Sequence, residues 1–165
     1  MKDIITIILS LSIFLFTSIS FGQNTVQPEI LENTIGEWKG GLTYLDYQTN
    51  EPFTMPVNLR IENGKNKYQF KLFLEYPKES NANSTDKIII SKDGTKINKA
   101  DVISNRIISE EEFEVITEYS GKDNNKKAEI RVIYIIGKTE LIIRKKVRFE
   151  NTENWILRSE YNYKR

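Results

Sequence analysis

The 165-residue sequence contains no cysteine and no histidine. The lack of cysteine excludes disulfide bonds, thiolate metal sites and cysteine nucleophiles. The lack of histidine excludes imidazole bases and removes the commonest protein ligand of zinc and the usual ligand of haem. A Ser-His-Asp or Cys-His hydrolase is therefore impossible, and we expect neither a metal site nor a cofactor.

No charge of one sign dominates, because 24 Lys and Arg stand against 23 Asp and Glu. Such a balance supplies no extended positive field, so we expect no nucleic-acid partner. Carboxylates remain as candidate catalytic groups, but the run Glu110-Glu111-Glu112 falls at an expected turn. No pair of carboxylates is flanked by residues that would bury it, as acid catalysis would need. We therefore expect a protein that is not an enzyme.

The N-terminus has the order of a secretory signal peptide. Lys2 precedes a mostly apolar run over residues 4–16, and Ser18, Ser20 and Gly22 are small residues suited to a cleavage region. We predict a signal peptide over residues 1–22 and a mature chain that is secreted or periplasmic. The alternative is an uncleaved membrane anchor, for which the apolar run is short.

Beyond this leader, alternation of apolar and polar residues with a period of two predicts β-strands. In the N-terminal segment 23–34, Pro28 suits the first position of one helical turn. Turn residues such as Asn63-Gly64 then separate segments of about ten residues. We expect strands over residues 37–47, 53–63, 66–76, 87–91, 95–98, 102–108, 112–120, 126–136, 139–149 and 154–163, with exposed loops at 77–85 and 121–125. Short connections without crossover helices predict antiparallel neighbours.

Nearly every predicted strand has one apolar and one charged face, so the sheet must either close on itself or fold into a sandwich. Meander connections favour closure, which also removes edge strands. A Greek-key sandwich is the alternative and needs longer loops. We predict an all-β fold: an antiparallel up-and-down β-barrel of about 8–10 strands, formed by a single domain over residues 35–165.

Gly36-Glu37-Trp38, at the start of the first predicted strand, resembles the Gly-x-Trp signature of the lipocalins and the wider calycin superfamily. The resemblance extends over about residues 30–163. It implies that Trp38 packs at the closed end of the barrel and that an arginine near the last strand lies across it. Arg158 is the matching position. Two departures are a loop at 48–52 that is short for a lipocalin lid and the lack of a helix after the last predicted strand.

Polar residues on the inward faces mark candidate ligand-binding positions, because burying a polar group without a partner is costly. These residues are Tyr44, Asp46, Thr117, Tyr119 and Lys145. A Lys145 ammonium facing a pocket would bind a carboxylate ligand. Alternatively, Asp46 and Lys145 lie at solvated barrel mouths or pair with each other. The large inward residues either line a pocket or fill the interior.

Two functions fit this sequence. The first is an exported lipocalin-like barrel that binds a small apolar or amphipathic ligand, which enters near Tyr44 and Asp46. The second is a non-enzymatic envelope interaction module with a filled barrel, which contacts a protein partner or a second copy through loop 77–85 or its outer face. Outward apolar residues support the second function; they are Leu45, Phe73, Ile116, Ile133, Ile135 and Ile156.

Overall fold

The computed structural model describes residues 24–165, so the expected signal peptide lies outside the described residues. The strands are β1 (Gly36–Leu45), β2 (Pro52–Asn63), β3 (Gln69–Glu75), β4 (Ser84–Ile89), β5 (Lys96–Ile97), β6 (Ala100–Ser109), β7 (Glu112–Asp123), β8 (Lys126–Gly137), β9 (Glu140–Phe149) and β10 (Ile156–Lys164). Two helical turns, α1 (Glu29–Glu32) and η1 (Ser80–Ala82), complete the described elements. No described helix has the length and apolar character needed to cross a membrane.

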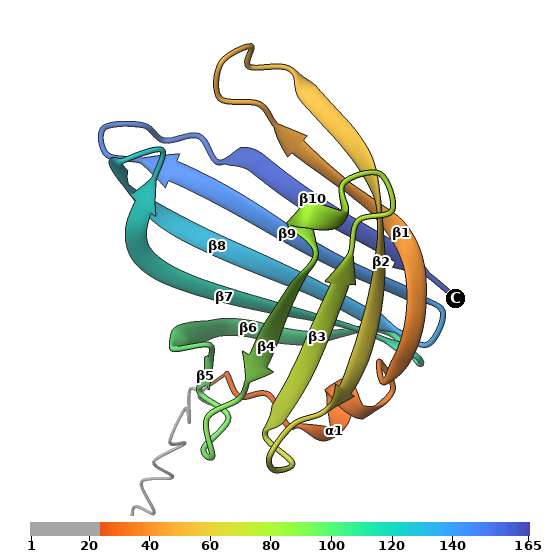
Figure 1. The fold of residues 1–165 in the computed structure, drawn as a ribbon. Helices are drawn as coiled ribbons and strands as arrows, with labels where there is room; N and C mark the ends of the chain where they lie inside the picture. The colour runs from red at the N-terminus through yellow and green to blue at the C-terminus, as the bar shows by residue number, and fades with distance from the viewer. Residues whose placement is uncertain (1–23) are drawn as a thin grey trace, which may run out of the picture.

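All ten strands belong to one sheet in the order β4-β3-β2-β1-β10-β9-β8-β7-β6-β5. Each pair of neighbours is antiparallel, and β1 pairs with β10, so the chain runs around a nearly closed barrel (Figure 1). The prediction of an antiparallel barrel is therefore confirmed, and the sandwich alternative is wrong. We call the end that carries α1 the lower end, and the end with the β1–β2 and β7–β8 turns the upper end.

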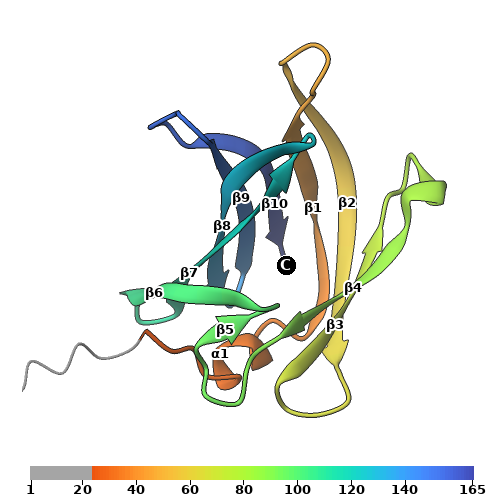
Figure 2. The ribbon, with the colours of Figure 1, turned by 90° about the vertical axis from the view of Figure 1, so that its left-hand side faces the viewer.

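The barrel closes through a small seam between β4 and β5. One bridge joins Ile90 to Ile97, and the Asn98 amide N–H donates to the carbonyl of Ile89 at 2.8 Å. The Asn98 side chain accepts from the N–H of Ile89 at 2.8 Å and donates to the carbonyl of Lys87 at 2.9 Å. Figure 2 shows β4 diverging from β6 above this point. A single asparagine therefore substitutes for a longer strand pair.

Two loops differ from the expected ones. The predicted loop 77–85 contains η1 and the first residues of β4. The predicted loop 121–125 is instead the end of β7 and a turn made by Asn124 and Asn125, whose φ angles are 47° and 62°. Positive φ at both central residues is what a two-residue hairpin turn requires, and asparagine tolerates it well. The β7–β8 hairpin is therefore longer than the sequence indicated.

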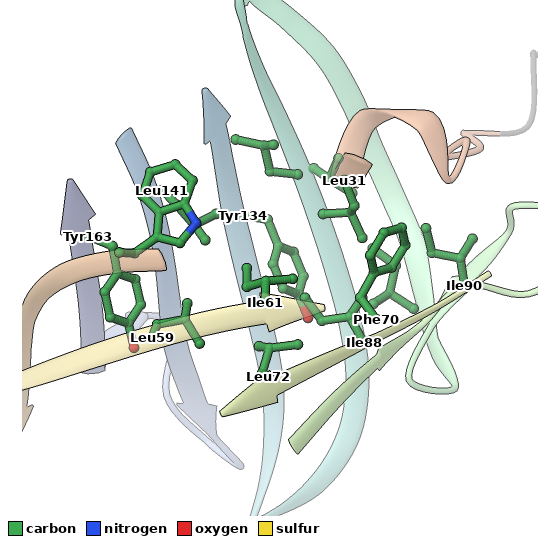
Figure 3. Close-up of a cluster of buried hydrophobic side chains, with 14 of the residues drawn as sticks. Leu31, Leu59, Ile61, Phe70, Leu72, Ile88, Ile90, Tyr134, Leu141 and Tyr163 are labelled. Carbon is green, nitrogen blue, oxygen red and sulfur yellow. The ribbon is translucent and has the colours of Figure 1, made fainter. Parts of the chain in front are cut away.

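Inward side chains fill the lower half of the barrel. Leu59, Ile61 and Phe70 are almost fully buried, and they meet Leu31 of α1 and Tyr134 from the opposite wall (Figure 3). Burial of each large apolar side chain contributes about 1.5–3 kcal/mol to stability. This packing makes the lower end of the barrel a solid core.

Trp38 lies in this core beside α1, with 1% of its surface exposed. Its indole N–H donates to the carbonyl of Thr34 at 2.7 Å. The arginine that lies across its ring is Arg165, whose guanidinium carbon is 4.2 Å from the ring centroid. Arg158, the position expected from the lipocalin resemblance, lies elsewhere, at the upper end. The expected arginine is thus replaced by one at the other end of the last strand.

Arg165 also joins three backbone segments at the lower end. Its Nε donates to the carbonyl of Lys138 at 2.6 Å, and its Nη1 donates to that of Ile35 at 3.1 Å. Its Nη2 donates to the carbonyl of Asn33, at the end of α1. Carbonyls at a helix end lack intrahelical partners, so the guanidinium supplies donors that the short helix needs.

We predict that Arg165→Lys lowers the free energy of unfolding by about 1–2 kcal/mol, because an ammonium keeps the charge but cannot reproduce the planar fork of donors. Urea denaturation followed by circular dichroism measures the change. Lys164→Ala is the control, since Lys164 is an exposed neighbour. Equal unfolding midpoints for Arg165→Lys and the unmodified protein would contradict the prediction.

We also predict that Asn98→Gly loosens the seam, lowering the free energy of unfolding by about 1–3 kcal/mol and speeding hydrogen exchange at the Ile89 amide. Glycine keeps the positive φ of 49° at this position but removes the side-chain hydrogen bonds. The matched control is Asn151→Gly, because Asn151 also has a positive φ, of 66°, in an exposed loop. If Asn98→Gly and Asn151→Gly change the free energy of unfolding and the exchange of the Ile89 amide equally, the Asn98 side chain does not hold the seam.

Candidate functional site

Three of the predicted site residues lie in one row across the inner wall. Thr117 of β7 and Lys145 of β9 both face Val132, and Ser159 of β10 stands between Lys145 and Tyr44 of β1. Thr117 is 1% exposed, and its hydroxyl has no hydrogen-bond partner among the described residues. Tyr119 is two residues further toward the upper end and is 42% exposed. The structure therefore brings Tyr44, Thr117 and Lys145 together, with Tyr119 above them.

Asp46 does not join this row. Its Oδ1 accepts the backbone N–H groups of Gln48 and Thr49, each at 2.8 Å, and the Thr49 hydroxyl at 3.1 Å. The hydrogen bonds from Thr49 and Gln48 lower the pKa of Asp46. Asp46 therefore stabilises the β1–β2 turn, and the expected pairing with Lys145 is wrong because nearer backbone donors satisfy its carboxylate.

Lys145 instead pairs with Asp123, at the tip of the β7–β8 hairpin. The Lys145 ammonium donates to Asp123 Oδ1 at 2.7 Å, and Arg158 Nε lies 3.1 Å from Asp123 Oδ2. The side chain of Asp123 is only 1% exposed. Figure 2 shows the β7–β8 hairpin curving across the upper end of the barrel, which brings Asp123 to these partners. We call Asp123, Lys145 and Arg158 the upper ion cluster.

A β-bulge explains the position of Arg158. The register between β9 and β10 shifts between Leu157 and Ser159, which leaves Arg158 as the extra residue. A bulge re-aims a side chain and reverses the alternation beyond it. Arg158 is therefore 8% exposed and reaches Asp123, while Ile156, expected to face outward, stands opposite the fully buried Val147 and is itself 36% exposed.

Tyr47 covers the upper ion cluster from the β1–β2 turn. The guanidinium carbon of Arg158 lies 3.8 Å from the centroid of the Tyr47 ring. Burial raises the pKa of Tyr47, and the nearby Asp123 carboxylate raises it further. Arg158 Nη2 is buried without a hydrogen-bond partner among the described residues. The stacked ring therefore shields a cation that its carboxylate partner only partly satisfies.

The charges in the upper ion cluster determine the ionisation of Asp123. Burial by itself would raise the pKa of this carboxyl, but the hydrogen bonds from Lys145 and Tyr47 and the charges of Lys145 and Arg158 outweigh it. The net result is a lowered pKa. The cluster joins β7, β9, β10 and the β1–β2 turn, so it acts as a latch at the upper end. The sequence suggested that Lys145 binds a ligand carboxylate; in this structure its ammonium instead donates to Asp123.

A cavity of about 120 Å³ lies inside the barrel, below the row that contains Lys145. One wall consists of Leu59, Leu72 and Leu74, and another of Tyr134, Tyr161 and Tyr163, with Asp86 and Lys87 of β4 at the side. Figure 3 shows Tyr134 and Tyr163 projecting into the same space as Leu59 and Leu72. The interior is therefore mostly filled but retains one small, largely apolar space.

The tyrosines of this cavity form a connected group. The hydroxyls of Tyr76 and Tyr161 are 3.3 Å apart, and the rings of Tyr161 and Tyr163 stack with centroids 5.9 Å apart. Burial raises the pKa of Tyr134, Tyr161 and Tyr163 well above the ordinary tyrosine range. These hydroxyls therefore remain protonated at neutral pH and are available as hydrogen-bond donors and acceptors.

The sequence missed Asp86, which fell between the predicted loop 77–85 and the predicted strand 87–91, and Asp123, which fell in the predicted loop 121–125. Asp86 is two residues before the buried Ile88, so extending the alternation of β4 backwards would have placed it on the inward face. The role of Asp123 depends on the curvature of a hairpin, for which alternation carries no signal.

A larger open hollow, of about 720 Å³, lies on the outer side of β1, β2 and β3, where Arg60, Glu37 and Lys39 line it. Within residues 24–165, no group of three or more carboxylates is placed to hold a metal ion.

Trp155, just before β10, lies on the outer surface near the upper end. The guanidinium carbons of Arg131 and Arg148 lie 4.2 Å and 4.9 Å from its ring centroid. Arg131 also makes a salt bridge with Glu118 at 2.7 Å. The half-buried indole therefore packs against two arginines on a charged face.

Comparisons with known proteins support the fold alone. No family model matches the sequence, and no curated protein matches it. The fold of this chain is similar to that in the crystal structure of Rv2717c from M. tuberculosis, with a TM-score of 0.56 and 11% sequence identity. The similarity covers 86% of this chain and 99% of that chain. The barrel architecture is therefore one that a solved protein of different sequence also adopts.

We predict that Asp123→Asn lowers the free energy of unfolding at pH 7 by about 2–4 kcal/mol, because it leaves the buried Arg158 and the partly exposed Lys145 without a charged partner. The pKa of Asp123 is lowered in the folded protein, so its stabilising contribution is present above the unfolded pKa of about 3.9 and is lost as pH falls through the folded value. The difference between variant and unmodified protein should therefore shrink below about pH 4.

Urea denaturation from pH 7 to about pH 2.5 measures this difference. Asp101→Asn is the control, because Asp101 forms an exposed salt bridge with Lys96. A difference that stays constant over the whole pH range would show that the charge of Asp123 does not hold the latch.

Proposed function

We propose that this chain is an exported, lipocalin-like barrel that binds one small apolar or amphipathic molecule in its interior cavity. The observation that carries the proposal is the cavity of about 120 Å³ between the leucine wall and the tyrosine wall. An engineered apolar cavity of about 150 Å³ in another protein binds benzene. The ligand is therefore small, with about four to six non-hydrogen atoms.

The two walls of the cavity support an amphipathic ligand. Leu59, Leu72 and Leu74 offer apolar surface, and burial of the ligand there gains about 25 cal/mol per Å². Tyr134 and Tyr161 offer hydroxyl groups on the other side. A ligand with an apolar body and one polar group satisfies both walls.

Export is part of the proposal and rests on the leader sequence. Lys2, the apolar run over residues 4–16 and the small residues up to Gly22 have the order of a signal peptide. N-terminal sequencing of the mature protein from the producing cell tests it, with Gln23 expected as the first residue.

The alternative function, an interaction module that uses the outer face, has less support. Ile133 and Ile142 lie on that face but are only 8% and 7% exposed. Arg144, directly opposite Ile133 in the sheet, pairs with Glu160, and such long charged side chains cover apolar surface with their aliphatic stems. The outer surface of these strands is therefore more polar than its sequence suggests.

We predict that a benzene-sized ligand binds with a stoichiometry of one, and that Ile143→Phe weakens the binding at least about tenfold by occupying the cavity. Native mass spectrometry of a fragment collection and NMR titration measure stoichiometry and affinity. Ile135→Phe is the matched control, because it makes the same change on the outer face of β8. Thermal unfolding of both variants checks that each is folded. The proposal fails if no small ligand binds the unmodified protein, or if both variants lose binding equally.

A further inference from the structure

Asp86 places a single carboxylate beside the interior cavity. It stands opposite Leu72 in the β3–β4 pair, and Leu72 is 7% exposed on the inward face, so the Asp86 side chain points to the same face. Its Oδ1 accepts the backbone N–H of Lys87 at 2.7 Å. Among the salt bridges of residues 24–165, none includes Asp86. The cavity therefore has a negative charge at its side without a cationic partner.

The nearest lysines do not neutralise this charge. Lys87 follows Asp86 directly and stands opposite Lys71, so alternation directs both side chains to the outward face. Lys87 also contributes to the lining of the cavity, but it forms no salt bridge with Asp86. Lys145, in the row above the cavity, is held by Asp123 in the upper ion cluster. The latch at the upper end therefore keeps the only inward lysine of β9 away from Asp86.

The wall that faces Asp86 is aromatic. Tyr134, Tyr161 and Tyr163 line the cavity, and two of their rings are stacked. Aromatic rings attract cations through the negative potential of their faces, and phenol oxygens accept hydrogen bonds from ammonium groups. Burial is the main cause of the raised pKa of Tyr134 and Tyr161; Tyr119 and Tyr76, respectively, come next, and the charge of Asp86 adds a smaller contribution to both.

The cavity is reached from the side of the barrel. Asp86 is exposed, and β4 pairs with β3 along one edge only, its other contact being the seam at its lower end. Figure 2 shows β4 and β6 diverging above the seam. Because Asp86 is exposed and lines the cavity, a ligand that enters from this side meets its carboxylate.

We infer that the cavity selects a small organic cation, an alkylammonium with about four to six non-hydrogen atoms, over neutral molecules of the same shape. The charge contacts Asp86 and the tyrosine wall, and the alkyl groups contact the leucines. The inference rests on the proposed function, because it names the chemical class of the ligand that the cavity binds.

The test uses two ligands that differ in charge but hardly in shape, tert-butylammonium and tert-butanol. NMR titration of the full mature chain at pH 7 gives both affinities, and the ring signals of Tyr134 and Tyr161 report the place of binding. We expect the cation to bind about tenfold more tightly than the alcohol. Tetramethylammonium, which has no N–H donor, separates attraction to the rings from hydrogen bonding; it should bind more tightly than tert-butanol.

Asp86→Asn should weaken binding of tert-butylammonium about tenfold and leave binding of tert-butanol unchanged. Glu79→Gln is the matched control, because it removes the same charge from the exposed loop before β4 and should change neither affinity. Equal binding of the two ligands, or a cation affinity that Asp86→Asn does not change, would overturn the inference while leaving the proposed function intact. If neither these ligands nor benzene binds, the cavity is not a binding site and the proposed function fails as well.

Discussion

The contact between β4 and β5 turns an open ten-stranded sheet into a barrel, and it is small. An antiparallel sheet with one apolar face has to cover that face, and here it does so by curling until its two end strands meet. They meet at the bridge between Ile90 and Ile97 and at the side chain of Asn98. The core, the cavity and the opposition of Asp86 to the tyrosine wall all depend on this closure.

The two ends of the barrel are held by different chemistry. At the lower end, Arg165 joins a buried indole to backbone carbonyls, and apolar packing surrounds them. At the upper end, the ion cluster of Asp123, Lys145 and Arg158 joins the β7–β8 hairpin to β9 and β10, beside a small apolar cluster of Ala128, Ile130 and Val147. The stability contributed by apolar packing varies little with pH, whereas the stability contributed by a buried, ionised carboxylate is lost in acid. The upper end is therefore the part of the barrel that responds to its surroundings.

Sequence patterns predicted the strands, their antiparallel order and the inward position of Lys145, because alternation and turn residues are local signals. They did not predict where side chains meet across the barrel. Arg158 was assigned to Trp38 from the lipocalin resemblance, but Lys39 pairs with Lys164, so Arg165 lies over Trp38 and Arg158 lies at the other end of β10. One alternative paired Asp46 with Lys145, but its own turn supplies closer donors to the Asp46 carboxylate. Asp123 was assigned to a loop because Asn124 and Asn125 make a tighter turn than the run of polar residues suggested.

The positions of the two tryptophans allow each end of the barrel to be observed optically. Trp38 is sealed in the lower core, whereas Trp155 is half-buried against Arg131 and Arg148 near the upper end. The sequence contains no other tryptophan. A buried indole emits at shorter wavelength than one in contact with water, and replacing either residue by phenylalanine leaves a single tryptophan, which can be excited selectively over the tyrosines. Loosening of the upper end and melting of the core would then appear as separate spectral events in an unlabelled protein.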